Sequence, residues 1–212
     1  MSAVGTSLSP LIHLIDDDEA VRQSLSLLIG TVGLRVRTWA DPAGFLREFD
    51  RQDIGAIVLD IRLPGISGLS VLDELTAQGI DQPVIMLTGH GTVDLCRRAF
   101  KSGATEFLEK PVDDELLIET LQNAIRLHVK RRQQHQADHD AEKRFAQLSE
   151  REREVLGLIV SGLTNKEIGR VLNLSPRTVE THRANLFAKL QAESLALLIR
   201  RYAHLADRDS PP

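Results

Sequence analysis

The stretch Ile54-Gly55-Ala56-Ile57-Val58-Leu59-Asp60 places an aspartate directly after a short run of apolar residues. A run this short and this continuously apolar is typical of a strand buried on both faces of a parallel sheet. The runs Leu11–Ile15 and Pro83–Leu87 have the same character. Leu34–Thr38 and Glu106–Leu108 are mixed, as edge strands can be, so we expect five strands of two kinds.

Segments with helical spacing separate these strands. They are Ala20–Ile29, Pro42–Phe49, Leu69–Ala77, Val93–Lys101 and Glu115–Leu127. Strands that alternate with helices predict an α/β domain with a parallel sheet. Placing the two mixed strands at the edges gives the strand order 2-1-3-4-5, which is the flavodoxin-like order of flavodoxin and CheY.

The pattern changes after residue 127. The segment His128–Gln147 is rich in charged and amide side chains and has no glycine or proline, which predicts a solvated helical extension. The remainder reads as four helices, which open with the capping box at Ser149–Glu152 and end at about Tyr202. We therefore expect an α/β domain over residues 10–128, a helical linker over 129–147 and an all-α four-helix domain over 148–206.

Charge and cysteine content narrow the class of protein. Of the 212 residues, positions 1–142 hold 22 acidic and 14 basic side chains, a net of −8, and positions 143–212 hold 8 and 12, a net of +4. The basic second part is suited to a polyanionic partner. The single cysteine, Cys96, excludes an intramolecular disulfide and fits a reducing compartment. With no signal peptide pattern and no apolar run near the ~20 residues of a membrane span, we expect a cytoplasmic protein without membrane contact.

Polar side chains gather where the predicted strands end. They are Asp16, Asp17 and Asp18 after the first strand, Asp60 after the third, Thr88 after the fourth and Lys110 after the fifth. Ligands of open α/β sheets bind at this edge. Clustered carboxylates suit Mg²⁺, a lysine beside them attracts a phosphoryl group, and an aspartate can accept one. For Asp17 or Asp18 taken alone, the alternative is a cap on the helix that follows.

Four motifs at these positions resemble the receiver domain of two-component response regulators. They are Ile15–Asp18, Leu59–Gly65, Thr88–Gly91 and Phe107–Pro111, within residues 10–128. The resemblance implies that Asp60 accepts a phosphoryl group from a sensor histidine kinase. It also implies that Lys110 binds the phosphoryl oxygens.

The same resemblance implies the metal and the switch. Asp17 and Asp60 would ligate Mg²⁺, together with the backbone carbonyl of Arg62, and Asp16 would act mainly through water. Thr88 and Phe107 would respond to phosphorylation by shifting. The family also has a cis peptide bond before the proline that follows the lysine, which is Lys110-Pro111 here.

The last part of the chain resembles a LuxR-type helix-turn-helix of the FixJ/NarL class. The runs Leu148–Glu152, Gly162–Ile168 and Leu174–Arg183 carry this resemblance. The third helix is expected to enter the major groove of duplex DNA, with Val179, Leu186 and Leu190 facing the core. Candidates for base contacts are Arg177, Glu180, Thr181 and Ala184, and candidates for phosphate contacts are Lys166, Thr178, Arg183 and Lys189. Glu180 either accepts a hydrogen bond from a cytosine amino group or only caps or pairs locally.

Together these features predict a DNA-binding response regulator that forms a homodimer on phosphorylation and acts with RNA polymerase. We expect no enzyme activity beyond slow autodephosphorylation. A rival hypothesis is an aspartate-dependent phosphohydrolase. It is disfavoured because Arg62, rather than a second acidic residue, lies two positions after Asp60. A second rival is a phosphorylation-independent regulator, which the complete set of receiver residues disfavours. For the pair His135 and His139, a solvated linker face is expected rather than a metal site.

Overall fold

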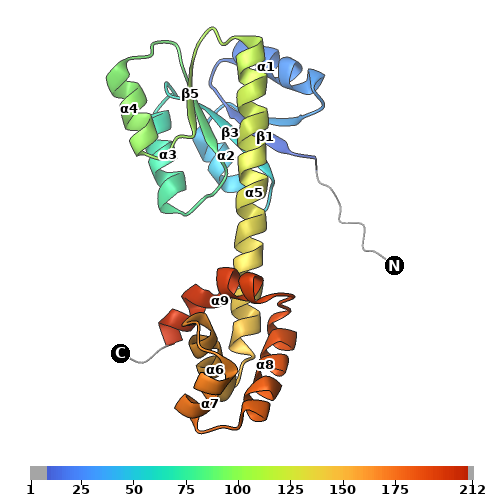
Figure 1. The fold of residues 1–212 in the computed structure, drawn as a ribbon. Helices are drawn as coiled ribbons and strands as arrows, with labels where there is room; N and C mark the ends of the chain where they lie inside the picture. Colours follow the sequence, from blue (N-terminus) through green and yellow to red (C-terminus); the bar gives the residue numbers. More distant parts are fainter. Residues whose placement is uncertain (1–8, 210–212) are drawn as a thin grey trace. The chain divides into compact units, whose positions relative to one another are not determined.

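The computed structural model describes residues 9–209 and divides between Arg132 and Gln133 into two compact units. In the first unit strands and helices alternate along the chain (Figure 1). The strands are β1 (Leu11–Ile15), β2 (Arg35–Trp39), β3 (Gly55–Asp60), β4 (Val84–Thr88) and β5 (Glu106–Glu109). The helices are α1 (Glu19–Thr31), α2 (Pro42–Glu48), α3 (Gly68–Ala77), α4 (Val93–Lys101) and α5 (Asp114–Ala146).

The five strands form one parallel sheet in the order β2-β1-β3-β4-β5, which confirms the predicted order. Every residue of β1, β3 and β4 is buried, whereas β2 and β5 each have exposed residues. Continuous burial therefore marks the central strands, because helices cover both of their faces.

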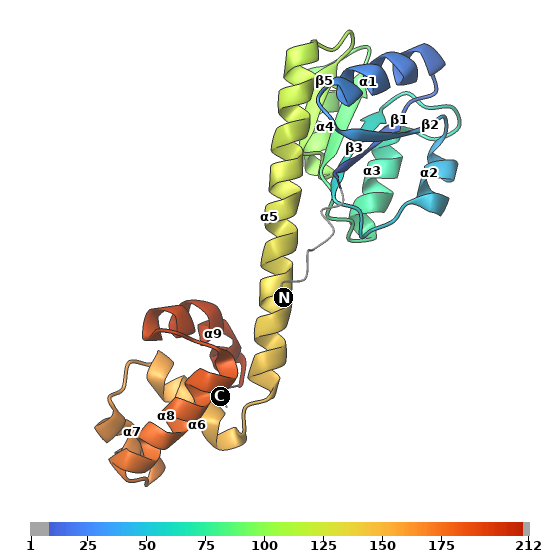
Figure 2. The same ribbon diagram turned by 90° about the vertical axis from the view of Figure 1, so that its right-hand side faces the viewer.

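Helices pack on both faces of the sheet (Figures 1 and 2). Helices α1 and α5 cover one face, where Leu117 and Leu121 join the cluster that contains Ile12 of β1. Helices α2, α3 and α4 cover the other face, where Phe45 packs in the cluster that contains Ile57 of β3. The carboxyl ends of all five parallel strands meet at one edge, and this edge carries the polar side chains.

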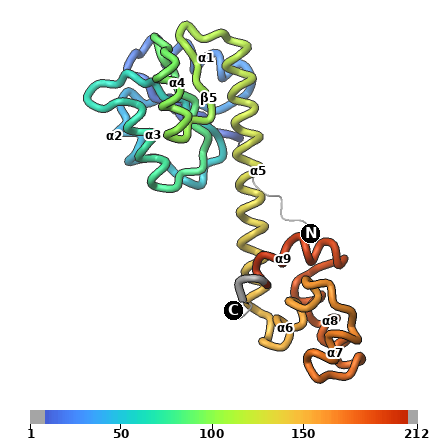
Figure 3. The backbone as a smooth tube through the Cα atoms, turned by 60° about the vertical axis from the view of Figure 1, so that its left-hand side comes forward, coloured from blue at the N-terminus to red at the C-terminus, as the bar shows by residue number. Residues whose placement is uncertain are grey.

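Helix α5 is a single helix of 33 residues, so the predicted last receiver helix and the predicted helical extension are continuous (Figure 3). The predicted solvated extension is helical, but two of its side chains are buried. His128 is buried, with its Nδ1 atom 3.1 Å from the backbone nitrogen of Gly55. Ala141 is 1% exposed and belongs to the core of the second unit. His128 is buried against the backbone of Gly55 and Ala141 among apolar side chains, and the composition of the segment reveals neither contact.

The second unit contains α6 (Glu150–Val160), α7 (Asn165–Leu172), α8 (Pro176–Leu190) and α9 (Leu195–Asp209) in addition to the end of α5. The predicted capping box opens α6: Ser149 and Glu152 exchange both of its hydrogen bonds. Helix α9 extends past the expected end at Tyr202, because Leu205 and Ala206 continue its buried face.

The turn between α7 and α8 is tight. Asn173 has a left-handed backbone with φ of 57°, and a Cβ atom at Gly169 would lie 2.7 Å from the carbonyl oxygen of Leu174. Within residues 9–209, no helix is both long and apolar enough to cross a lipid bilayer.

Candidate functional site

Three strand ends bring one lysine and two aspartates into direct contact. Asp60 is the last residue of β3, Asp16 follows β1, and Lys110 follows β5. The Lys110 ammonium donates hydrogen bonds to Asp16 Oδ2 at 2.6 Å and to Asp60 Oδ2 at 2.8 Å. Both carboxylates are buried, with side chains 0% and 8% exposed, so these are strong charge-assisted contacts.

A third carboxylate completes the cluster, and it is that of Asp17. Oxygen atoms of Asp16, Asp17 and Asp60 lie within 4.8 Å of one another, and the Asp17 side chain is exposed. Asp18 has the other role considered for this run. It caps α1 by accepting hydrogen bonds from the backbone nitrogens of Ala20 at 2.8 Å and Val21 at 3.4 Å. Three clustered carboxylate oxygens with access to solvent are the donor set that Mg²⁺ prefers.

The charges at this edge perturb one another. Burial raises the pKa of Asp16 above its usual value, although hydrogen bonds from Lys110 and from the Asp18 backbone oppose the shift. Burial also disfavours the charged form of Lys110, but the hydrogen bonds to Asp16 and Asp60 outweigh it and raise the pKa of the lysine. Lys110 therefore carries its positive charge throughout the physiological pH range.

The other predicted receiver residues surround this cluster. The backbone nitrogen of Arg62 donates to Asp60 Oδ1 at 3.2 Å, which places the Arg62 backbone beside the carboxylate. Thr88 is buried, and its hydroxyl both accepts from His90 N and donates to His90 O, each at 3.2 Å. The peptide bond Lys110-Pro111 is cis, as the resemblance implied.

Phe107 is half-buried on β5, at a surface groove beside α4. The groove is lined by Gly91, Thr92, Val93, Cys96, Arg97, Phe100, Phe107 and Glu109. Two of its side chains are apolar and exposed: Val93 is 75% exposed and Phe100 is 46% exposed. The aromatic ring at the predicted switch position therefore borders an apolar surface.

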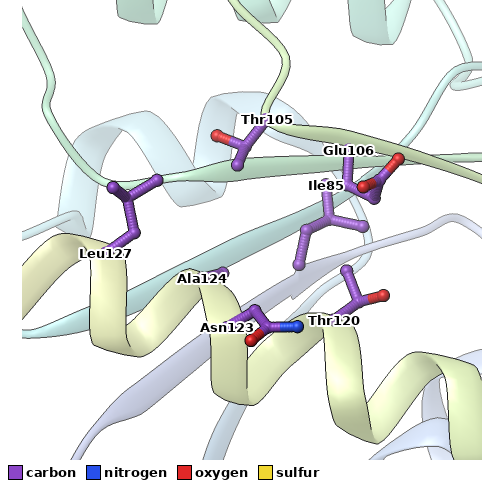
Figure 4. Close-up of a pocket in the computed structure, with 7 residues that line it drawn as sticks. All are labelled: Ile85, Thr105, Glu106, Thr120, Asn123, Ala124 and Leu127. Atoms are coloured by element: carbon purple, nitrogen blue, oxygen red, sulfur yellow. The ribbon is translucent and has the colours of Figure 1, made fainter.

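A separate pocket of about 120 Å³ lies where α5 faces β4 and β5 (Figure 4). Its lining residues are Ile85, Thr105, Glu106, Thr120, Asn123, Ala124 and Leu127. None of the predicted site residues is among them. The candidate functional site is therefore the cluster of carboxylates and not this pocket.

In the second unit, α8 has one buried and one exposed face. Val179, Leu186 and Leu190 are buried, as their spacing predicted. The four candidates for base contacts are all exposed: Arg177, Glu180, Thr181 and Ala184. Helix α8 therefore presents to solvent the face that would enter a DNA groove.

The candidates for phosphate contacts differ in their surroundings. Lys166 is exposed on α7. The Thr178 hydroxyl lies 2.8 Å from Ser175 Oγ, and the Arg183 guanidinium lies 6.0 Å from the Phe187 ring centre. Lys189 is already bound, because its ammonium donates to Glu152 Oε2 at 2.6 Å.

The pairing of Lys189 with Glu152 was not foreseen from the sequence. The capping box had assigned Glu152 a local role, and the two residues lie 37 positions apart. Lys189 lies in the last turn of α8, one position before the buried Leu190, and nothing in the local sequence indicates its partner on α6.

Comparison with known proteins identifies both units. Residues 12–122 match the response regulator receiver domain, and residues 146–202 match the luxR family of bacterial regulatory proteins. The transcriptional regulatory protein FixJ of Azorhizobium caulinodans is 47% identical over 189 residues, covering 89% of this chain and 90% of that protein. The chain belongs to the NarL/FixJ family of DNA-binding response regulators.

Two further relatives share this domain arrangement with the regulator. The C4-dicarboxylate transport transcriptional regulatory protein DctR of Rhodobacter capsulatus is 41% identical over 195 residues, covering 91% of this chain and 99% of DctR. The solved structure of the response regulator StyR matches with a TM-score of 0.81 at 35% identity, covering 92% of this chain and 99% of StyR. The similarity therefore extends over both units and the helix between them.

Proposed function

We propose that the regulator accepts a phosphoryl group on Asp60 from a phosphohistidine of a sensor kinase in the cytoplasm, and that the phosphorylated form controls transcription. The observation that carries this proposal is the Lys110 ammonium held between Asp16 and Asp60, at 2.6 and 2.8 Å. Asp60 is the carboxylate in this cluster that ends a central strand, so the scaffold fixes its position.

The transfer depends on position and charge. A carboxylate oxygen of Asp60 attacks the phosphorus atom, the bond from phosphorus to the imidazole nitrogen breaks, and the electron pair of that bond stays on the departing imidazole. Lys110 holds the phosphoryl oxygens with its positive charge. Asp17, Asp60 and the Arg62 carbonyl would hold Mg²⁺, with Asp16 acting through water. When bound, Mg²⁺ neutralises negative charge on the carboxylates and on the phosphoryl oxygens.

The response begins at Thr88 and Phe107. The phosphoryl group adds about −1.5 to −2 charge at Asp60. The Thr88 hydroxyl then exchanges its hydrogen bonds with His90 for one to the phosphoryl group, and Phe107 turns inward. This movement reshapes the groove between α4 and β5, whose exposed Val93 and Phe100 supply an apolar surface for a second receiver. We propose that the homodimer forms here and places two copies of α8 on DNA.

The regulator acts as a phosphoacceptor and not as a turnover enzyme. Arg62 and His90 are exposed and lie two positions after Asp60 and Thr88, respectively. Neither supplies a carboxylate base toward water, and a guanidinium cannot act as a base at all, which supports slow hydrolysis at Asp60. RNA polymerase is the proposed partner of the DNA-bound form.

Acetyl phosphate and mass spectrometry test the phosphoacceptor. With Mg²⁺, the wild type should gain the mass of one phosphoryl group. Asp60→Asn should gain none, because the amide lacks the nucleophilic oxygen. Asp18→Asn is the matched control, since it neutralises a neighbouring carboxylate that only caps α1. Phosphorylation of Asp60→Asn at the wild-type level, or multiple turnovers of acetyl phosphate per minute, would contradict the proposal.

Cys96 provides a probe of the dimer face, because it is half-buried and lines the groove beside Phe107. Phosphorylation should slow its modification by a maleimide and raise the molecular mass measured by sedimentation. Thr88→Ala should still accept phosphate but respond weakly in both measurements. Unchanged Cys96 reactivity in a phosphorylated dimer would place the interface elsewhere.

A further inference from the structure

We infer that Lys189 is a positioning residue, which fixes the angle of the DNA-reading helix α8 through Glu152 and does not contact a DNA phosphate. The inference rests on the assignment of α8 as the helix that reads DNA. It concerns one basic residue on the recognition helix whose side chain is 41% exposed but whose ammonium already donates to a buried carboxylate.

The carboxylate of Glu152 accepts hydrogen bonds from two residues, Ser149 and Lys189. The Oε2 atom of Glu152 accepts from Ser149 N at 2.8 Å, from Ser149 Oγ at 3.0 Å and from Lys189 Nζ at 2.6 Å. The Glu152 side chain is 5% exposed, so this charge depends on its donors. Burial favours the neutral acid, but the hydrogen bonds from Lys189 and Ser149 outweigh it and lower the pKa of Glu152. Glu152 is therefore ionised at neutral pH.

The pair joins two helix ends. Glu152 lies in the first turn of α6 and Lys189 lies in the last turn of α8. The neighbouring residue Leu190 is also held, because its carbonyl oxygen accepts a hydrogen bond of 2.8 Å from the buried hydroxyl of Tyr202 on α9. The C-terminal end of α8 is therefore fixed by polar contacts from two different helices.

Because α8 is long, a small rotation at its fixed C-terminal end would displace the residues that are expected to contact bases. Thr181 lies eight residues before Lys189, which is about 12 Å along a helix axis. A rotation of about 5° at the Lys189 end would displace Thr181 by about 1 Å, which is enough to break a hydrogen bond to a base edge. Loss of the Lys189 contact should therefore affect the reading of sequence more than the attraction to phosphates.

A phosphate contact would compete with this arrangement. The Lys189 side chain is 41% exposed, but an ammonium drawn toward a phosphate would loosen its 2.6 Å bond to Glu152, whose buried carboxylate would then depend on the donors from Ser149. Lys166 is also exposed, on α7, but no buried carboxylate among the described residues accepts a hydrogen bond from it. It serves as the matched control, since Lys166→Met removes the same charge from the same unit.

The test measures the affinity of the full-length phosphorylated chain for two duplexes over a range of salt concentrations. One duplex is selected from a random library by the wild type, and the other is its scrambled counterpart. Lys189→Met and Glu152→Gln should each weaken binding to the selected duplex about ten-fold and leave the scrambled duplex within about two-fold. The salt slope should stay at the wild-type value, and the double variant should be no weaker than either single variant.

Lys166→Met should instead weaken both duplexes and reduce the slope of log K against log salt by about 0.9, the value for one lost phosphate contact. The same change of slope in Lys189→Met would overturn the inference. Lys189→Arg, which retains a cation for Glu152, should recover the preference for the selected duplex. If Lys189→Met unfolds the second unit, loss of preference in folded Glu152→Gln still supports the inference, and unchanged preference refutes it. A wild type without salt-dependent DNA binding would refute the proposed function itself.

Discussion

The substitution Gly68→Ala tests whether backbone packing holds the phosphoacceptor in place. Gly68 opens α3, and its N–H donates to the Ile61 carbonyl at 2.9 Å. A Cβ atom here would lie 2.1 Å from the Asp60 carbonyl oxygen and 2.9 Å from Ile61 Cα. Ordinary contact between such atoms needs about 3.3 Å, so the Asp60 backbone or the start of α3 must move by about 1 Å.

This movement has two expected consequences. Overpacking of this kind costs about 1–3 kcal/mol in the free energy of unfolding. A displacement of about 1 Å at a reacting group also lowers its rate by up to about 100-fold, so phosphorylation of Gly68→Ala by acetyl phosphate should slow markedly. No ionisable side chain is changed. A slower reaction would therefore report the position of Asp60 and not its chemistry.

Gly30→Ala is the matched control in the same unit. A Cβ atom at Gly30, near the end of α1, would meet nothing within 4 Å, so this variant should be as stable as the wild type or more stable by up to about 1 kcal/mol. Urea unfolding followed by the fluorescence of Trp39, which is the single tryptophan and is buried beside α2, measures both variants. A folded Gly68→Ala protein that is phosphorylated at the wild-type rate would refute the reasoning.

Three further predictions concern other parts of the chain. Combining Arg62→Asn with His90→Glu should speed loss of the phosphoryl group after the donor is removed, since two large side chains beside the acceptor are expected to exclude water; equal decay rates would count against this shielding. Burial lowers the pKa of His13 to about 4, so the folded state binds fewer protons than the unfolded chain below pH ~6.5. The contribution of His13 to the free energy of unfolding is fully present above that pH and should fall by up to about 1.4 kcal/mol per pH unit on acidification towards pH 4. In urea unfolding, His13→Leu should therefore show a weaker dependence of this free energy on pH. Tyr202→Phe leaves the buried carbonyl of Leu190 without its 2.8 Å donor and should cost about 1–3 kcal/mol in the unfolding of the second unit measured by circular dichroism, whereas a cost near zero would mean that the bond contributes little.

Much of the fold could be predicted because burial determines which positions of the sequence are apolar. The strands β1 and β3 are apolar at nearly every position, since helices cover both of their faces, and this record alone separated central strands from edge strands. Strand ends were less well predicted: β2 runs to Trp39, one residue beyond the expected end, because Trp39 pairs with Ile15 of β1. Such an end depends on the neighbouring strand and not on local composition.

The residues of the receiver site were predictable from the motifs, but one local role was left open. For Asp17 or Asp18 taken alone, the sequence allowed a cap on the following helix, and the backbone at the start of α1 decides that Asp18 is the cap. Contacts between distant residues left no local record. The hydrogen bond from the Gly55 backbone nitrogen to His128 Nδ1 joins residues 73 positions apart, and the sequence around neither residue predicts it.

The lysine–carboxylate groups of the two units contain similar side chains but differ in their balance of charge. In the second unit, one ammonium and a capping serine satisfy the single carboxylate of Glu152. In the receiver, one ammonium from Lys110 faces three clustered carboxylates, those of Asp16, Asp17 and Asp60. Carboxylates that outnumber the neighbouring cations repel one another, so the receiver cluster would favour an added cation, whereas the charge of Glu152 is matched by Lys189. The balance of charge within a cluster, more than the residue types in it, therefore distinguishes a group suited to a cation from a contact that holds two helices together.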